Sequence, residues 1–210
     1  MSFFSEPKNA GLAFIIIGVI TVVFGIITVI LGLMKFEIDV GDETKVFALG
    51  AAIAAIGSII YGCMQFGYGK KVRDGTISAK IDILATFVKL VGVGAIVTGI
   101  FGAIGELVNS LDAGKEILDA LGGSLVSALI SIVIGLIIIW IGTKINDGKQ
   151  TLGDKIIWVI LLIVFILGII AAIIEFFGIV TIPLAICDLI IYVFMLLLLF
   201  DPEVKSEMGI

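Results

Sequence analysis

The 210-residue sequence contains no histidine and only two cysteines, and charged residues make up only 15% of it. Without histidine, the chain lacks the commonest metal ligand and the side chain that most often acts as a general base near neutral pH. Cys63 and Cys187 both fall in apolar runs, so they indicate neither a disulfide framework nor a metal cluster. The sequence has no phosphate-binding loop, nucleophile elbow or paired-cysteine motif. We therefore predict a protein that is not an enzyme and that holds no cofactor or metal ion.

Apolar residues are the abundant class. They make up 60% of the chain, and the mean hydropathy is +1.31, whereas soluble domains average roughly 45–50% apolar residues. They are grouped in runs long enough to cross the roughly 30 Å hydrocarbon core of a bilayer as helices. The sequence predicts an all-α integral membrane protein with a single transmembrane domain, 1–210. Its six spans are expected near Gly11–Met34, Val46–Gly69, Ile81–Gly105, Leu121–Gly142, Ile156–Phe177 and Ile179–Phe200.

The basic residues predict the orientation of these spans. Nine lysines and arginines fall on the side that holds both termini, three fall on the opposite side, and Lys89 lies inside a span. Because cytoplasmic loops carry the excess of basic residues, both termini are expected in the cytoplasm, and the expected location is the plasma membrane of a prokaryote. Trp140, Trp158 and Tyr68 are expected to form an aromatic belt at the inner ends of the spans.

The two longer outer connections have different patterns. "KFEIDVGDETK" (35–45) is rich in carboxylates and predicts a solvated acidic loop. The stretch 106–123 has leucines at positions 107, 111, 118 and 121. This spacing places them on one face and predicts a short helix lying on the outer surface of the membrane.

An internal repeat is the most specific pattern in the sequence. Residues 50–75 align with residues 123–148 at a shift of 73, with nine of 26 positions identical, among them Gly69/Gly142. Both copies end in Lys-x-x-Asp-Gly, where Gly75 and Gly148 are expected to end the helix in the left-handed conformation. We predict two helical hairpins, 11–75 and 84–148, and a degenerate third hairpin, 156–200. The alternative is chance similarity between two apolar stretches.

Small residues recur at helical spacing in the first four spans. In "GVITVVFGIITVILG" (18–32), glycines and threonines both recur every seven residues, which places them on one nearly straight stripe. Such a stripe could line a pathway through the membrane, but helices in lipid pack closely through small residues, and we favour helix packing. The predicted packing residues are Gly11, Gly18, Thr21, Gly25, Thr28, Gly32, Ser58, Gly62, Gly92, Gly99, Ser131 and Gly135.

Charged residues within or near the spans are the candidate functional groups, because charges inside a membrane usually have a functional role. Lys89 is expected to extend toward the headgroups and Asp82, or else to pair with Asp188 in the sixth span. Glu175, at an outer span end, is expected to lie at the membrane interface, or else to form a proton or cation path with Asp188 and Lys89.

The function that the sequence favours is a non-enzymatic structural or accessory membrane subunit. Its expected partners are membrane lipids and either further copies of the chain or other membrane subunits, with no nucleic acid. The alternative is a small channel or transporter that uses Lys89 and Asp188 at the interface between the repeats.

Overall fold

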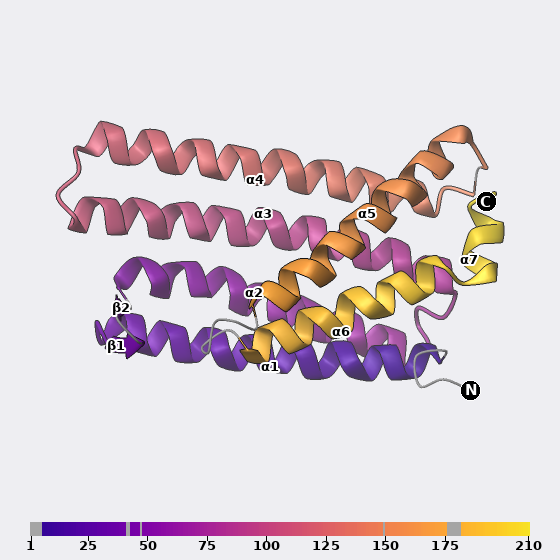
Figure 1. The fold of residues 1–210 in the computed structure, drawn as a ribbon, viewed down its shortest axis with the longest axis horizontal. Coiled ribbons are helices and arrows are strands. Elements are labelled where there is room, and N and C mark those ends of the chain that lie inside the picture. Colours follow the sequence, from indigo (N-terminus) through magenta and orange to yellow (C-terminus); the bar gives the residue numbers. More distant parts are fainter. Residues whose placement is uncertain (1–5, 41–42, 47, 149, 176–181) are drawn as a thin grey trace. The chain divides into compact units, whose positions relative to one another are not determined.

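The computed structural model describes residues 6–40, 43–46, 48–148, 150–175 and 182–210. These residues form helices joined by turns, together with one short pair of strands (Figure 1). In chain order the elements are α1 (Pro7–Leu33), β1 (Glu37–Val40), β2 (Glu43–Val46), α2 (Leu49–Arg73), α3 (Lys80–Asp112), α4 (Ile117–Ile145), α5 (Leu152–Glu175), α6 (Ile182–Leu199) and α7 (Pro202–Glu207).

Five of these helices, α1 to α5, are long and apolar enough to cross a membrane. This result supports the predicted class, a helical multi-pass membrane protein. α6 is apolar but shorter, with 18 residues. The connection between the fifth and sixth predicted spans falls largely at 176–181, outside the described residues.

The connection between α3 and α4 differs from the prediction. α3 continues to Asp112, seven residues beyond the expected end of the third span, and α4 begins at Ile117. The predicted surface helix in 106–123 is therefore wrong, because Leu107 and Leu111 belong to the last turns of α3. The leucines at 107 and 111 belong to α3 and those at 118 and 121 belong to α4, and a short turn separates the two helices.

A β-hairpin follows α1 where the sequence predicts a solvated acidic loop. β1 pairs with β2 in antiparallel register, with Glu37 opposite Val46 and Val40 opposite Glu43. The segment Glu-Ile-Asp-Val alternates polar and apolar residues, which is a strand pattern. The prediction of a loop relied on the high charge of the segment and not on this alternation.

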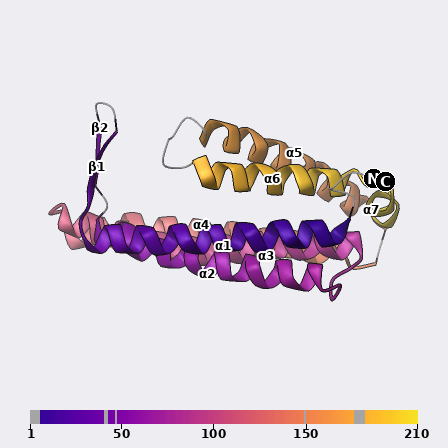
Figure 2. The same cartoon turned by 90° about the horizontal axis from the view of Figure 1, so that it is seen from below.

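The chain divides into two compact units, and α1 to α4 each contribute one part to each unit. The first unit comprises Met1–Ile20, Gln65–Leu90 and Ile138–Ile210, and the second comprises Thr21–Met64 and Val91–Ile137. Within the first unit, α5 and α6 lie side by side in both views (Figures 1 and 2).

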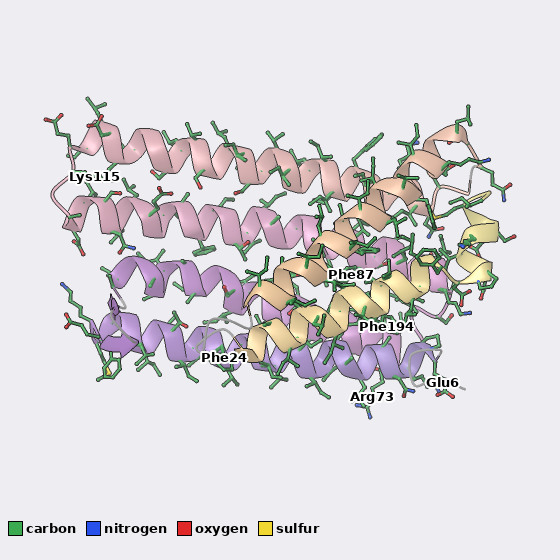
Figure 3. The ribbon with its side chains drawn as sticks, viewed as in Figure 1. Glu6, Phe24, Arg73, Phe87, Lys115 and Phe194 are labelled. Carbon is green, nitrogen blue, oxygen red and sulfur yellow. The ribbon has the colours of Figure 1, made fainter. Side chains whose placement is uncertain are left out.

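Aromatic rings form the core of the first unit. Phe14 lies at its centre, with its ring centroid 4.9 Å from Tyr68, 5.6 Å from Phe87 and 6.3 Å from Phe194. Figure 3 labels Phe87 and Phe194 in this region. The Tyr68 hydroxyl donates a 2.7 Å hydrogen bond to the carbonyl oxygen of Ile83, and Tyr68 is only 4% exposed. The predicted place of Tyr68 in an interfacial belt is therefore wrong, because its hydroxyl is satisfied inside the helix bundle.

In the second unit, consecutive helices contact one another through glycines. A Cβ atom placed on Gly25 of α1 would lie 3.3 Å from the carbonyl oxygen of Ala55 in α2. On Gly50 of α2 it would lie 2.2 Å from the carbonyl oxygen of Gly105 in α3, and on Gly99 of α3 it would lie 2.2 Å from Cβ of Ser131 in α4. Each helix in this unit thus packs closely against the next one along the chain.

The two Lys-x-x-Asp-Gly segments form the predicted helix ends. Gly75 follows α2 with φ +75°, and Gly148 follows α4 with φ +69°. Glycine adopts this left-handed conformation at low cost, so it ends a helix and allows a sharp turn. The predicted turns are confirmed at both positions.

Candidate functional site

The candidate site is the α2–α3 groove of the second unit. We define it by Gly50, Ala51, Ala54, Gly102, Gly105, Glu106, Asn109, Ser110, Ala113 and Lys115, which enclose a volume of 420 Å³. Its floor consists of glycine and alanine residues from α2 and α3. Its polar groups come from the last turns of α3 and from the turn that follows, where Figure 3 labels Lys115.

The groove exists because α2 and α3 approach each other at backbone distance at one end. A Cβ atom on Gly105 would lie 2.3 Å from the carbonyl oxygen of Gly50, so both positions exclude any larger side chain. Asn109 secures this crossing, because its side-chain oxygen accepts a 3.1 Å hydrogen bond from the backbone N–H of Gly50. That N–H belongs to the first turn of α2, where backbone donors have no partner within the helix.

Gly102 is the open position of the groove. A Cβ atom placed there would meet no atom within 4 Å, unlike one on Gly105 three residues later. Glu106 lies near α4. A Cβ atom placed on Gly123 of α4 would lie 4.0 Å from the Glu106 carboxylate oxygen Oε1. Glu106 and Lys115 are both exposed and place one charge of each sign in the lining.

The predicted packing residues are buried or partly buried. Gly11, Gly18, Gly25 and Gly32 are all buried, and Thr21 and Thr28 are partly buried. The Thr28 hydroxyl donates a 2.9 Å hydrogen bond to the carbonyl oxygen of Phe24, one turn earlier. Among the other predicted packing residues, Gly62, Gly92 and Gly135 are buried and Ser58, Gly99 and Ser131 are partly buried.

Of the three candidate charges, the structure describes the side chains of Lys89 and Asp188, and it forms no ion pair between them. Lys89 is partly buried in α3, and Asp188 is partly buried in α6. Among the described side chains none forms an ion pair with Lys89. Glu175 ends α5, and its side chain lies outside the described part of the chain.

A polar cluster in the first unit was not predicted from the sequence. The Lys80 ammonium lies 2.7 Å from the Asp201 carboxylate and 3.3 Å from that of Glu203, which links the start of α3 to α7. Asp201 also caps α7 by accepting a hydrogen bond from the backbone N–H of Glu203. Val204 and Met208 are almost fully buried, so the C-terminal segment contributes to the core of the first unit.

A second contact holds α7 to the turn between α4 and α5. The Gln150 side chain donates a 2.9 Å hydrogen bond to the carbonyl oxygen of Ser206. Nearby, at the start of α5, the Asp154 carboxylate accepts hydrogen bonds from the Thr151 backbone N–H at 2.6 Å and from the Thr151 hydroxyl at 2.9 Å. The burial of the Asp154 carboxylate is thus explained by helix capping.

We expect Lys80→Gln to loosen α7 without unfolding the bundle. Partly exposed ion pairs contribute little, so amide hydrogen exchange at residues 203–208 should become about three-fold faster. Lys144→Gln removes the 3.0 Å ion pair with Asp147 and is the matched control. Unchanged exchange at α7 in Lys80→Gln would show that these ion pairs do not hold the helix.

The chemistry available in the described residues is that of packing and polar contact. No three cysteine, aspartate or glutamate side chains among them come together as a metal site. The chain matches no protein-family model, and neither a curated protein nor a solved structure matches it.

Proposed function

We propose that this protein is a non-enzymatic, multi-pass membrane subunit that assembles with further copies of itself through the α2–α3 groove. One observation carries this proposal, the unfilled floor of the groove at Gly102. At the helix contacts formed by Gly25, Gly50 and Gly99, a neighbouring helix covers the glycine, whereas a Cβ atom on Gly102 meets nothing. Small-residue surfaces in membranes favour close approach of another helix.

The same unit also exposes bulky apolar side chains. In the second unit, α4 exposes eight large apolar side chains, each 48% to 60% exposed: Leu125, Val126, Leu129, Ile130, Val133, Ile134, Leu136 and Ile137. Bulky side chains on one helix fit a groove floored by glycine and alanine on another. A second copy could therefore supply the helix that fills the groove.

We infer six spans with both termini in the cytoplasm. Five helices are long enough to cross a membrane, and α6 would supply the sixth span despite its shorter length. The excess of basic residues on the side of the two termini supports this orientation.

A duplicated hairpin is part of the same proposal. A Cβ atom on Gly69 would approach the carbonyl oxygen of Gly11 and the backbone nitrogen of Ile15, both at 2.7 Å. On Gly142 it would approach the carbonyl oxygen of Ala85 at 3.0 Å and the backbone nitrogen of Lys89 at 2.9 Å. Gly142 is 73 residues after Gly69, and each of its partners is 74 residues after the corresponding partner of Gly69. This shared helix register supports a duplication more strongly than sequence identity does.

Filling the groove tests the proposed assembly. Gly102→Leu adds a side chain where the structure leaves open space, so the subunit should fold but lose self-association. Gly67→Leu is the matched control, because a Cβ atom there also meets nothing within 4 Å and the position lies outside the groove. The mass of each purified variant in detergent micelles, measured by light scattering, reports the outcome.

The expected result is an oligomer for the wild type and for Gly67→Leu, and a monomer for Gly102→Leu. If Gly102→Leu keeps the wild-type mass, the groove is not the assembly surface. If the wild type is purified in complex with a different membrane protein and not with itself, self-assembly is wrong.

A further inference from the structure

Lys89 packs against Gly142 of α4. Its side-chain Cγ and its backbone nitrogen would lie 2.8 Å and 2.9 Å from a Cβ atom placed on Gly142. The stem of the lysine therefore rests on a bare stretch of helix backbone. At Gly69 the corresponding backbone nitrogen is that of Ile15, and the side-chain atom in contact is Cβ of Phe14. The first hairpin therefore has no charged residue at the position that Lys89 holds in the second.

The neighbours of Gly142 on α4 indicate the level of this contact in the membrane. Gly142 lies two residues after Trp140, which is about 3 Å along the helix, and three residues before the end of α4 at Ile145. Trp140 is 58% exposed. Exposed tryptophans in membrane proteins collect at the level of the lipid headgroups. Since α3 side chains lean toward its N-terminus, we expect the Lys89 ammonium to extend toward that end of α3.

The charge of Lys89 has no ion-pair partner among the described residues. None of their carboxylates forms an ion pair with it. Asp82, the nearest acidic residue along α3, instead accepts a hydrogen bond from the Asn146 side chain. A cation at the edge of an apolar bundle is costly unless an anion or water reaches it.

We propose that Lys89 binds the phosphate group of a membrane phospholipid. Phospholipid phosphates lie at the level where lysines near helix ends reach the headgroups. Because both leaflets contain phospholipids, this site does not depend on the orientation of the protein or on its assembly.

Lipid titration of the full-length protein tests the site. The protein in detergent micelles is mixed with dioleoylphosphatidylglycerol, and bound lipid is counted by native mass spectrometry. Dioleoylglycerol, which has the same chains and no phosphate, measures binding through the chains alone. Sodium phosphate, added as a competitor, measures binding of free phosphate.

Lys89→Leu should bind the phospholipid roughly tenfold more weakly than the wild type, and Lys89→Arg should retain most of the affinity. Lys155→Leu removes an exposed lysine from α5 and should leave the affinity unchanged. If Lys89→Leu does not fold, Lys89→Met keeps the length of the stem and should show the same loss.

Three results would overturn the assignment. The first is equal phospholipid binding by the wild type and by the folded variant that lacks the charge. The second is equal binding of dioleoylglycerol and phosphatidylglycerol by the wild type, which would assign the binding to the acyl chains. The third is displacement of the lipid by sodium phosphate, which would assign the site to free phosphate.

Discussion

Gly69→Leu should unfold the first unit or separate α1 from α2. A Cβ atom at this position would lie 2.7 Å from two backbone atoms of α1, the Gly11 oxygen and the Ile15 nitrogen, and 2.8 Å from Cβ of Phe14. Helix backbones cannot yield as the far end of a side chain can, so the helices must move apart. Overpacking of this kind costs about 3 kcal/mol or more of unfolding free energy. Denaturant titration of the protein in mixed micelles, followed by circular dichroism, measures the loss.

Gly67→Leu is the control for this prediction. It adds the same side chain to the same helix two residues earlier, where a Cβ atom meets nothing within 4 Å. Its unfolding free energy should stay within about 0.5 kcal/mol of the wild-type value. Similar losses for the two variants would mean that α2 resists leucine in general and that the contact with Gly11 is not specific.

Phe14→Ala is the substitution with the second large effect. The Phe14 side chain is 1% exposed, and its ring contacts the rings of Tyr68, Phe87 and Phe194. Removing the ring leaves a cavity among three aromatic neighbours, and the expected loss is about 3–5 kcal/mol. The thermal unfolding midpoint of the purified protein in detergent should fall by roughly 10 °C.

Phe66→Ala is the matched control for the aromatic core. Phe66 lies on α2 near Tyr68, but its side chain is 42% exposed. Its removal should change the midpoint by no more than about 2 °C. A small effect of Phe14→Ala would indicate that the surrounding helices collapse into the space and that the rings do not hold the unit together.

The membrane class and the helix ends at Gly75 and Gly148 could be predicted from the sequence because they depend on local properties. Apolar runs of sufficient length indicate spans by themselves, and an Asp-Gly pair after a lysine indicates a C-cap without reference to the rest of the chain. The position of α7 also had a local signal. Asp201, Pro202 and Glu203 combine an N-cap residue, a proline at the first helical position and an acidic first turn.

The α2–α3 groove could not be predicted, because it depends on how two helices are aligned with each other. Gly102 and Gly105 belong to the same glycine-rich stretch, yet only Gly105 meets the backbone of α2. The contact of Asn109 with Gly50 joins residues 59 positions apart, and neither position carries a local sign of the other. Likewise, the spacing of the glycines did not reveal that Gly67 is open whereas Gly69 is in close contact.

The depth of Lys89 could not be predicted from the sequence for the same reason. Counting from the predicted start of the third span at Ile81 places Lys89 about 12 Å into the membrane. The contact with Gly142 places it level with the last turn of α4, two residues along that helix from the exposed Trp140. The depth of a charged residue is thus set by the neighbouring helix as well as by its own position along the chain.

The most direct test of the proposed assembly is the number of copies of the wild-type protein in one particle taken from its membrane without detergent. Membranes that contain the full-length chain are dissolved into polymer-bounded lipid discs, and the protein stoichiometry of each disc is measured by single-molecule counting of a C-terminal fluorophore. The proposal predicts discs with two or more copies, and discs with one copy for Gly102→Leu at the same expression level. Discs that hold a single wild-type chain throughout would contradict it.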